Sequence, residues 1–334
     1  MTSRKLTLLL LAALVVIGGA LWLSQQRSLP RDLGTETKLF DSLQGELNAI
    51  DSMTVSQSGE RTTLQRSANG WQVAERGFAA DQGKLRKFLI DFAGLRIAEK
   101  KTSLPAKYTE LGIDDPSKPG ASSTLVELRS GEKSLAAVIL GKNAGGRGVF
   151  ARKPGDAQGL LVEPSLSPSA KPADWLAHEL VDIAAKDIVG LTVTQAGRTY
   201  RLRRPSTDSP HLAIVDLPKG RTTISDDATD QSARALEKLE MTDLAHRSDS
   251  SDFSPVDHAR AELSDGTFVD IAGHSDNNRA RITIDAGVVS GATDNPAAPS
   301  AETMRRLAGF VFDVPTWRYT SLFRPLEDML KPAG

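Results

Sequence analysis

The chain repeats itself, and this repeat constrains the fold more than any other feature of the sequence. Residues 50–59 recur as residues 188–197, with Thr54 matching Thr192 138 positions later. With the same shift Leu64 meets Leu202, so the match covers a whole hairpin. Alternating side chains around a Gly turn predict two antiparallel strands with one buried face. The chain is therefore expected to fold this hairpin twice.

The match continues further along the chain with a smaller shift. Residues 127–131 resemble residues 262–266 at a shift of 135, and residues 139–141 resemble residues 271–273 at a shift of 132. Loop deletions produce such a drift. Two copies are too few for a solenoid, which needs several units to cover its open faces. The sequence therefore predicts a tandem pair of related domains.

The repeat divides the chain into successive parts. Residues 44–163 and 181–290 are predicted to form two related, β-rich α+β domains, each with antiparallel strands and one packed helix. A connector rich in Ser and Pro spans residues 164–180, and residues 291–334 form a loop with a helical and aromatic tail. Helices are expected after Asp81 in the first domain and after Ser225 in the second. In the second helix Leu236 and Leu239 would share one face.

An uncharged apolar segment precedes both repeats. It runs from Leu6 to Leu23, directly behind Arg4 and Lys5, and about 18 helical residues span the hydrocarbon core of a bilayer. The basic residues favour a cytoplasmic N-terminus (residues 1–5), a juxtamembrane linker (24–43) and a periplasmic body. The alternative is a cleaved signal peptide, but the apolar run continues past the small residues through Trp22. We therefore expect an uncleaved single-pass anchor in the bacterial inner membrane.

Composition excludes several classes of function. The fractions of hydrophobic residues (40%) and charged residues (25%) are typical of globular domains, so the body is not disordered. A formal net charge of −1 gives no long-range field to attract nucleic acid, and no nucleic-acid partner is expected. The chain contains no Cys, which excludes disulfides, thiolate metal sites and cysteine nucleophiles.

Two short motifs resemble catalytic signatures but are better explained as turns. Residues 130–133 fit the Ser-x-x-Lys pattern of penicillin-recognising enzymes. Ser130 and Gly131 predict a hairpin turn, which is not expected to bring Ser130 and Lys133 together as a helix does. Residues 141–148 are rich in Gly, but Arg147 and Gly148 stand where a phosphate-binding loop has Lys and Ser or Thr. The sequence therefore assigns no catalytic or cofactor-binding residue.

The histidines do not form a recognisable metal motif. The five are His178, His211, His246, His258 and His274. The last three lie near several Asp residues in sequence, but no two have the three- or four-residue spacing that places two ligands on one helix face. We expect them to be solvated loop side chains, and the paired carboxylates at 114–115 and 226–227 to cap a helix or shape a turn. No metal ligand is assigned.

Aromatic residues near the C-terminus allow two interpretations. Trp317, Tyr319 and Phe323 lie among polar residues after a segment of helical character at 302–311. Packing onto the second repeat is favoured over a partner-binding patch. An exposed Trp71 or Trp317 above a groove would instead indicate a glycan- or lipid-binding module.

The chain resembles the bacterial envelope family known as domain of unknown function (DUF) 4340. The resemblance rests on the single N-terminal anchor, on residues 50–55 followed by Trp71, and on residues 108–116, where Ile113 replaces the usual Leu. It covers residues 1–290. In the second repeat residues 253–255 are all that matches the segment 108–116. Because members of such families often occur with ABC-type exporters, including those resembling gliding-motility transporters, the resemblance implies an accessory subunit and no catalytic residues.

These observations favour binding over catalysis. We expect a membrane-anchored periplasmic scaffold, held in the inner membrane by Leu6 to Leu23, that contacts membrane transporter subunits. The alternatives are an envelope hydrolase or metal-dependent enzyme with a dispersed site, and a glycan- or lipid-binding module. His246, His258 and Asp276 within ligand distance of one another would favour the metal-dependent enzyme.

The absence of native Cys makes the topology directly testable. A single cysteine introduced after residue 40 is expected to react with a membrane-impermeant thiol reagent added outside the inner membrane, because the anchor places the body there. The unmodified chain is the control, since it contains no thiol. Labelling only after lysis would contradict the predicted orientation.

Overall fold

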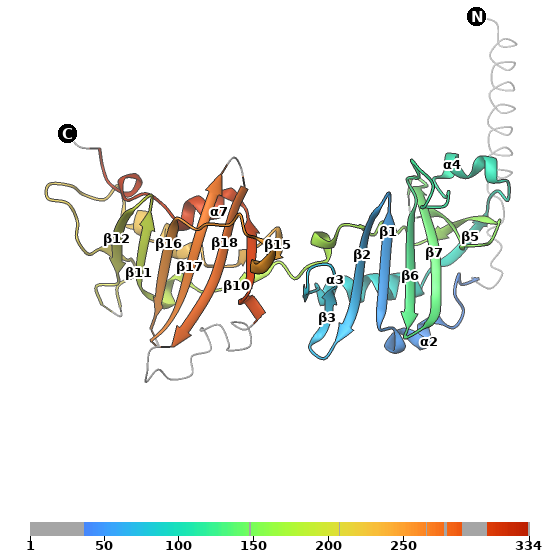
Figure 1. Cartoon of the computed structure of the whole chain (residues 1–334), viewed down its shortest axis with the longest axis horizontal. Helices are drawn as coiled ribbons and strands as arrows, with labels where there is room; N and C mark the ends of the chain where they lie inside the picture. Colours follow the sequence, from blue (N-terminus) through green and yellow to red (C-terminus); the bar gives the residue numbers. More distant parts are fainter. Residues whose placement is uncertain are drawn as a thin grey trace, which may run out of the picture.

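Two large antiparallel sheets dominate the computed structural model, which describes residues 37–146, 148–206, 208–264, 266–276, 279–288 and 306–332. Helices are few and short within these ranges, which confirms the β-rich α+β class. Figure 1 shows the two sheets side by side, the first in blue to green and the second in yellow to orange. Each sheet corresponds to one copy of the repeat.

The first sheet has nine strands in the order β4-β3-β2-β1-β6-β7-β8-β9-β5. They are β1 (Ser52–Gln57), β2 (Glu60–Ser67), β3 (Gly70–Val73), β4 (Phe78–Ala79), β5 (Arg96–Lys100), β6 (Thr124–Ser130), β7 (Lys133–Asn143), β8 (Val149–Arg152) and β9 (Gly159–Glu163). At the β5 edge, Leu39 donates a hydrogen bond to the Leu95 carbonyl and Ile97 donates one to the Thr37 carbonyl, both 2.8 Å long. The chain that enters the domain therefore lies along this edge.

The second sheet has eight strands in the order β13-β12-β11-β16-β17-β18-β19-β15. They are β11 (Ile188–Gln195), β12 (Arg198–Arg203), β13 (Ala213–Ile214), β15 (Asp243–His246), β16 (Asp257–Leu263), β17 (Thr267–Asp276), β18 (Arg279–Val288) and β19 (Phe310–Val314). A separate two-stranded sheet pairs β10 (Glu179–Val181) with β14 (Leu239–Glu240).

Strand pairing reproduces the repeat. Met53 pairs with Leu64 in β1 and β2, and Leu191 pairs with Leu202 in β11 and β12, 138 positions later for both partners. Val126 pairs with Val138, as Ala259 pairs with Ile271, 133 positions later for both. The sequence match at a shift of 132 is therefore wrong by one residue. A slip of one residue would move every side chain of a strand to the other face of the sheet. The observed register places Val138 and Ile271 at equivalent positions, and both side chains are buried.

One amphipathic helix covers the inner face of the first sheet. In α3 (Gln82–Ala93), the buried side chains of Leu85, Phe88 and Phe92 follow helical spacing. The Asp81 carboxylate accepts a 2.9 Å hydrogen bond from the Lys84 N–H, which confirms the predicted N-cap. Figure 1 shows α3 behind the strands. The connector contributes Trp175, which packs edge-on against Phe88 at 5.6 Å between ring centroids.

The C-terminal tail covers the inner face of the second sheet. Tyr319 and Leu322 of α7 (Thr316–Leu322) are buried with Phe323, whereas Trp317 remains 61% exposed. Gly273 on β17 makes this approach possible, because a Cβ there would lie 2.7 Å from both the Tyr319 and the Phe323 rings. The Tyr319 hydroxyl donates a 2.7 Å hydrogen bond to Asp257. Packing of Tyr319 and Phe323 onto the second repeat is therefore confirmed.

Two expectations for the second repeat are wrong in detail. Phe310 and Val311, expected in a helical tail, belong to β19, which pairs with β18 and β15, so the sheet continues beyond residue 290. Burial of four of the five β19 residues and pairing on both sides outweigh local helical preference there. The helix expected after Ser225 is only a 3₁₀ turn (Asp226–Thr229) followed by α5 (Gln231–Arg234), and Ser225 makes no capping hydrogen bond. Leu239 lies in β14, because Lys238 takes a left-handed backbone conformation that ends the helical segment.

The segment 108–116 folds onto the outer face of the first sheet. It begins with α4 (Tyr108–Leu111), which Gly112 ends in the left-handed conformation at φ +68°. This turn directs the fully buried Ile113 onto the sheet, where a Cβ on Gly141 would lie 2.7 Å from its side chain. The left-handed turn at Gly112 and the burial of Ile113 thus explain why residues 111–113 read Leu-Gly-Ile.

Within the described residues, the two halves contact each other through the Arg76–Asp243 ion pair and a cluster of aromatic rings. Arg76 donates two hydrogen bonds to Asp243, of 2.7 and 2.8 Å. Phe78 packs edge-on against Phe310 at 5.4 Å and Phe312 at 6.1 Å between ring centroids. Burial is the largest single effect on Asp243 and raises its pKa. The hydrogen bonds from Arg76 and from the Leu244 N–H, together with the positive charges of Arg76 and Arg279, outweigh burial and hold the pKa of this carboxyl below its ordinary value.

The predicted anchor lies outside the described residues. These comprise no helix that combines the length and hydropathy needed to cross a bilayer. The segment from Leu6 to Leu23, the N-terminal residues 1–5 and linker residues 24–36 are not among them.

The Arg76–Asp243 pair is expected to couple the halves in a pH-dependent way. A double-mutant cycle with Arg76→Ala and Asp243→Asn should give a coupling free energy on the order of 1 kcal/mol at pH 7. Because the folded-state pKa of Asp243 is depressed, this stability is present above the ordinary carboxyl pKa and is lost as pH falls through the folded value. Urea unfolding at pH 7 and in acid measures the change.

The exposed pair Lys87–Asp91, four residues apart on α3, is the matched control. Its coupling free energy should stay near about 0.3–0.5 kcal/mol, which is typical of exposed helix pairs. Equal coupling in both cycles, or a coupling at Arg76–Asp243 that does not change in acid, would contradict the assignment.

Candidate functional site

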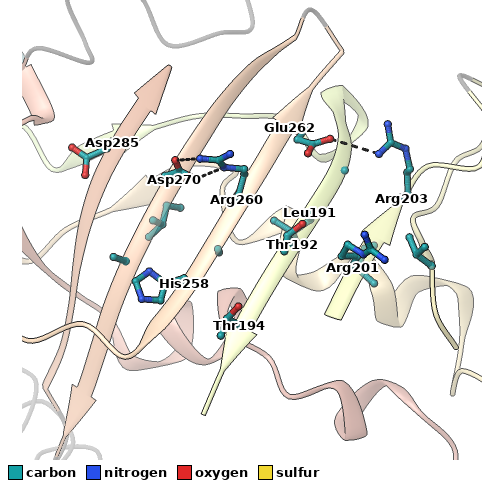
Figure 2. A pocket seen from close by; sticks show the side chains of 16 residues that line it. Leu191, Thr192, Thr194, Arg201, Arg203, His258, Arg260, Glu262, Asp270 and Asp285 are labelled. Carbon is teal, nitrogen blue, oxygen red and sulfur yellow. Dashed lines mark hydrogen bonds and ion pairs between the residues drawn. The ribbon is translucent and has the colours of Figure 1, made fainter. Parts of the chain in front are cut away.

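The outer face of the second sheet forms a groove. Side chains alternate along a strand, so residues next to the core positions point to this face. Residues of β11, β12, β16, β17 and β18 line this groove, which has a volume of about 840 Å³. Figure 2 shows polar side chains along it, among them Thr192, Thr194, Arg201, Arg203, His258, Arg260, Glu262, Asp270 and Asp285. The groove therefore brings polar side chains from five strands together on one face.

The charges in the groove are balanced. Arg260 donates two 2.6 Å hydrogen bonds to Asp270, and Arg203 lies 3.8 Å from Glu262, as Figure 2 shows. Arg201 and Asp285 pair with charges beside the groove, at 2.7 and 2.8 Å. A nearly neutral but polar surface suits a ligand or partner that supplies hydrogen bonds in place of strong net charge.

Arg260 is one of three arginines that line the groove. Its guanidinium lies 4.3 Å above the centre of the Phe268 ring, and the hydrogen bonds that it donates to Asp270 raise its pKa, so it stays charged. Thr194 bonds the hydroxyl of Thr199 at 2.8 Å. These groups present hydrogen-bond donors and acceptors to the groove.

The first sheet is more covered on its outer face. There Arg152 lies 4.7 Å above the Tyr108 ring, and Ile113 is buried against the sheet. In the second half residues 253–255 stand in place of that segment, and Arg281 lies 5.4 Å above the Phe253 ring. Both halves therefore have an arginine stacked on an aromatic ring. The segment over the second sheet is shorter, so more of the outer face of that sheet is open.

The three histidines first considered as metal ligands are not brought together. His246 packs on Phe310 at 4.6 Å between ring centroids, His258 lines the groove, and His274 lies 3.6 Å from Asp276. No metal-binding group within the described residues includes any of them. The fourth, His178, bonds the Met241 carbonyl at 2.8 Å.

The two motif-like segments lie in strand connections. Gly131 has a φ of +54° in the β6–β7 turn, as predicted. The expectation that this turn keeps Ser130 and Lys133 apart is wrong, because the two are cross-strand partners. The Lys133 ammonium, however, lies 3.9 Å from Glu46. In the Gly-rich stretch, residues 141–143 end β7, and β8 begins at Val149.

The paired carboxylates have different roles. Asp115 accepts hydrogen bonds from the Ser117 hydroxyl and backbone N–H, which lower its pKa, in the predicted turn. Asp227 does not cap a helix with its side chain; it pairs with Arg234 at 2.9 Å.

Sequence reasoning missed one cluster. His211, Asp227 and Asp230 place ligand atoms within 4.8 Å of one another, the one such group among the residues that the structure describes. The His211 Nδ1 lies 2.6 Å from Asp230 and 3.8 Å from Asp227. Asp227 and Asp230 follow His211 by 16 and 19 positions, and no sequence motif encodes such a separation.

The tryptophans do not form part of the groove. Trp71 is half-buried, with Arg66 5.2 Å above its ring. Trp317 is exposed and carries Arg318 4.5 Å above its ring, but it does not line the groove. The condition set for a glycan- or lipid-binding module is therefore not met at this groove.

Comparison with known protein families identifies a match. The family model described as "Domain of unknown function (DUF4340)" matches residues 71–257. That range runs from β3 of the first sheet to the start of β16 in the second. No curated protein matches the chain.

Two carboxylates of the second sheet should respond differently to neutralisation. Asp257→Asn is expected to cost on the order of 1–3 kcal/mol of unfolding free energy, because buried Asp257 accepts from the Tyr319 hydroxyl and the Ala196 N–H. Asp270→Asn should cost under about 1 kcal/mol, because its partner Arg260 is half-exposed in the groove. Urea unfolding of both variants measures the difference. The reverse order would show that the groove charges hold the fold together.

Proposed function

The chain belongs to the family described as domain of unknown function DUF4340, and we propose that it is a membrane-anchored binding protein of the bacterial envelope, an accessory component of an ABC-type transport complex. In this proposal the domains bind a polar surface of a transporter subunit and carry out no catalysis. The observation that carries the proposal is the open, charge-balanced groove on the second sheet.

The chemistry of the groove supports a protein partner. Its paired arginines and carboxylates are half-exposed, so they can exchange partners without leaving a buried charge unpaired. Polar surfaces with complementary charge set orientation and specificity more than raw affinity. That suits a subunit that has to dock in one orientation beside a membrane protein.

The short stretch of sequence between the first sheet and the proposed anchor supports a membrane partner. Thr37 already bonds to the β5 edge, so residues 24–36 form the whole link to the proposed anchor Leu6 to Leu23. Fully extended, that link reaches about 45 Å. A domain tethered so closely meets partners in the same bilayer at high effective concentration.

A matched pair of variants tests the groove. Thr194→Arg fills the groove, whereas Ser56→Arg changes the position 138 residues earlier, on the outer face of β1. Both side chains are half-buried on outer faces. Tagged full-length protein is purified in mild detergent, and co-purifying membrane proteins are identified. Ser56→Arg should recover the same multi-span transporter as the unmodified chain, and Thr194→Arg should recover at least about tenfold less.

Melting curves of both variants control for folding. Repeated recovery of the unmodified chain alone would contradict the transporter partnership. Equal recovery by both variants, with a transporter present, would place the partner surface elsewhere than the groove.

A further inference from the structure

A cluster of one imidazole and two carboxylates lies at the end of the second sheet, away from the groove. His211 lies in the loop between β12 and β13, Asp227 in the 3₁₀ turn Asp226–Thr229, and Asp230 directly before α5. We propose that these three residues form a binding site for a divalent cation, and that Zn²⁺ is the ion it takes. One nitrogen and two oxygen ligands match the borderline preference of zinc.

The distances between the ligand atoms fit the ion with small adjustments. Tetrahedral zinc with bonds of about 2.0–2.1 Å separates its ligands by about 3.3 Å. The His211 Nδ1 lies 2.6 Å from the Asp230 Oδ2 and 3.8 Å from the Asp227 Oδ1. When zinc binds, the first distance would therefore lengthen and the second would shorten. The neutral imidazole then presents its Nδ1 lone pair to the ion and carries its proton on Nε2.

Asp230 is held in place for this role. Its side chain is 6% exposed, and its Oδ1 accepts a 2.9 Å hydrogen bond from the Leu212 N–H. The other oxygen, Oδ2, is therefore the one directed at His211. An outer hydrogen bond of this kind orients a metal-binding carboxylate and strengthens the site.

Arg234 now supplies the positive charge near the two carboxylates. Its guanidinium lies 2.9 Å from Asp227 and 4.0 Å from Asp230. The Arg234 side chain is 50% exposed, so it can turn into solvent when the ion binds, and exposed ion pairs contribute little to stability. Arg234 is therefore a competitor for the site, and its removal should strengthen zinc binding.

A separate pocket leaves room for a further ligand. About 380 Å³ is enclosed beside His211 by side chains that include Ser209, Thr223 and Thr229. It shares no lining residue with the groove. Three protein ligands leave the fourth zinc position free for water or a small polar molecule from this pocket.

Calorimetric titration of the full-length protein in mild detergent tests the site. Zn²⁺ should bind at one equivalent, and Mg²⁺ at the same concentration should give no comparable heat. His211→Ala and Asp227→Asn should each weaken zinc binding at least about tenfold. His258→Ala is the matched control, because it removes a histidine from the groove and should leave the affinity unchanged.

Two further measurements keep the test decisive if a variant folds poorly. Zn²⁺ should raise the melting temperature of the unmodified chain, because a ligand that binds the folded state stabilises it. Arg234→Ala should bind zinc more tightly than the unmodified chain. The proposal is overturned if the unmodified chain does not bind zinc, if folded His211→Ala retains full affinity, or if Arg234→Ala weakens binding.

Discussion

Each sheet of this protein has one apolar face that must be covered, and the two halves solve this problem differently. In the first half α3 presents Leu85, Phe88 and Phe92 to the sheet. In the second half the helical segment is only four residues long, so α7 from the far end of the chain brings Tyr319 and Phe323. A sheet with one buried face is unstable without such cover, which makes the C-terminal tail part of the second core.

The need to cover apolar surface also joins the two halves of the protein. The Phe78 ring from the first sheet packs against Phe310 and Phe312 of β19. The Arg76–Asp243 pair closes the contact with directional hydrogen bonds. Because β19 also pairs with β18, the interface between the halves is continuous with the strands that bear the groove. A partner bound there would therefore engage a supported surface.

The two copies of the repeat differ in how much of the outer face of the sheet is covered. In the first half Tyr108 and Ile113 occupy the outer face, whereas in the second half residues 253–255 stand in their place. The exposed strands then carry alternating charged side chains such as Arg260 and Asp270, which satisfy one another across neighbouring strands. The strand pairing is therefore shared by both halves, whereas the segment over the outer face differs.

Local signals in the sequence determined the hairpins, the Asp81 cap of α3 and the family to which the chain belongs. These depend on contacts between near neighbours or on short patterns. The tertiary structure alone decided that Phe310 lies in a strand, because β15 and β18 lie on either side of β19. It also decided the groove, which needs the faces of several strands in register. The meeting of His211 with Asp230 depends in the same way on how two loops fold against each other, which no spacing along the chain encodes.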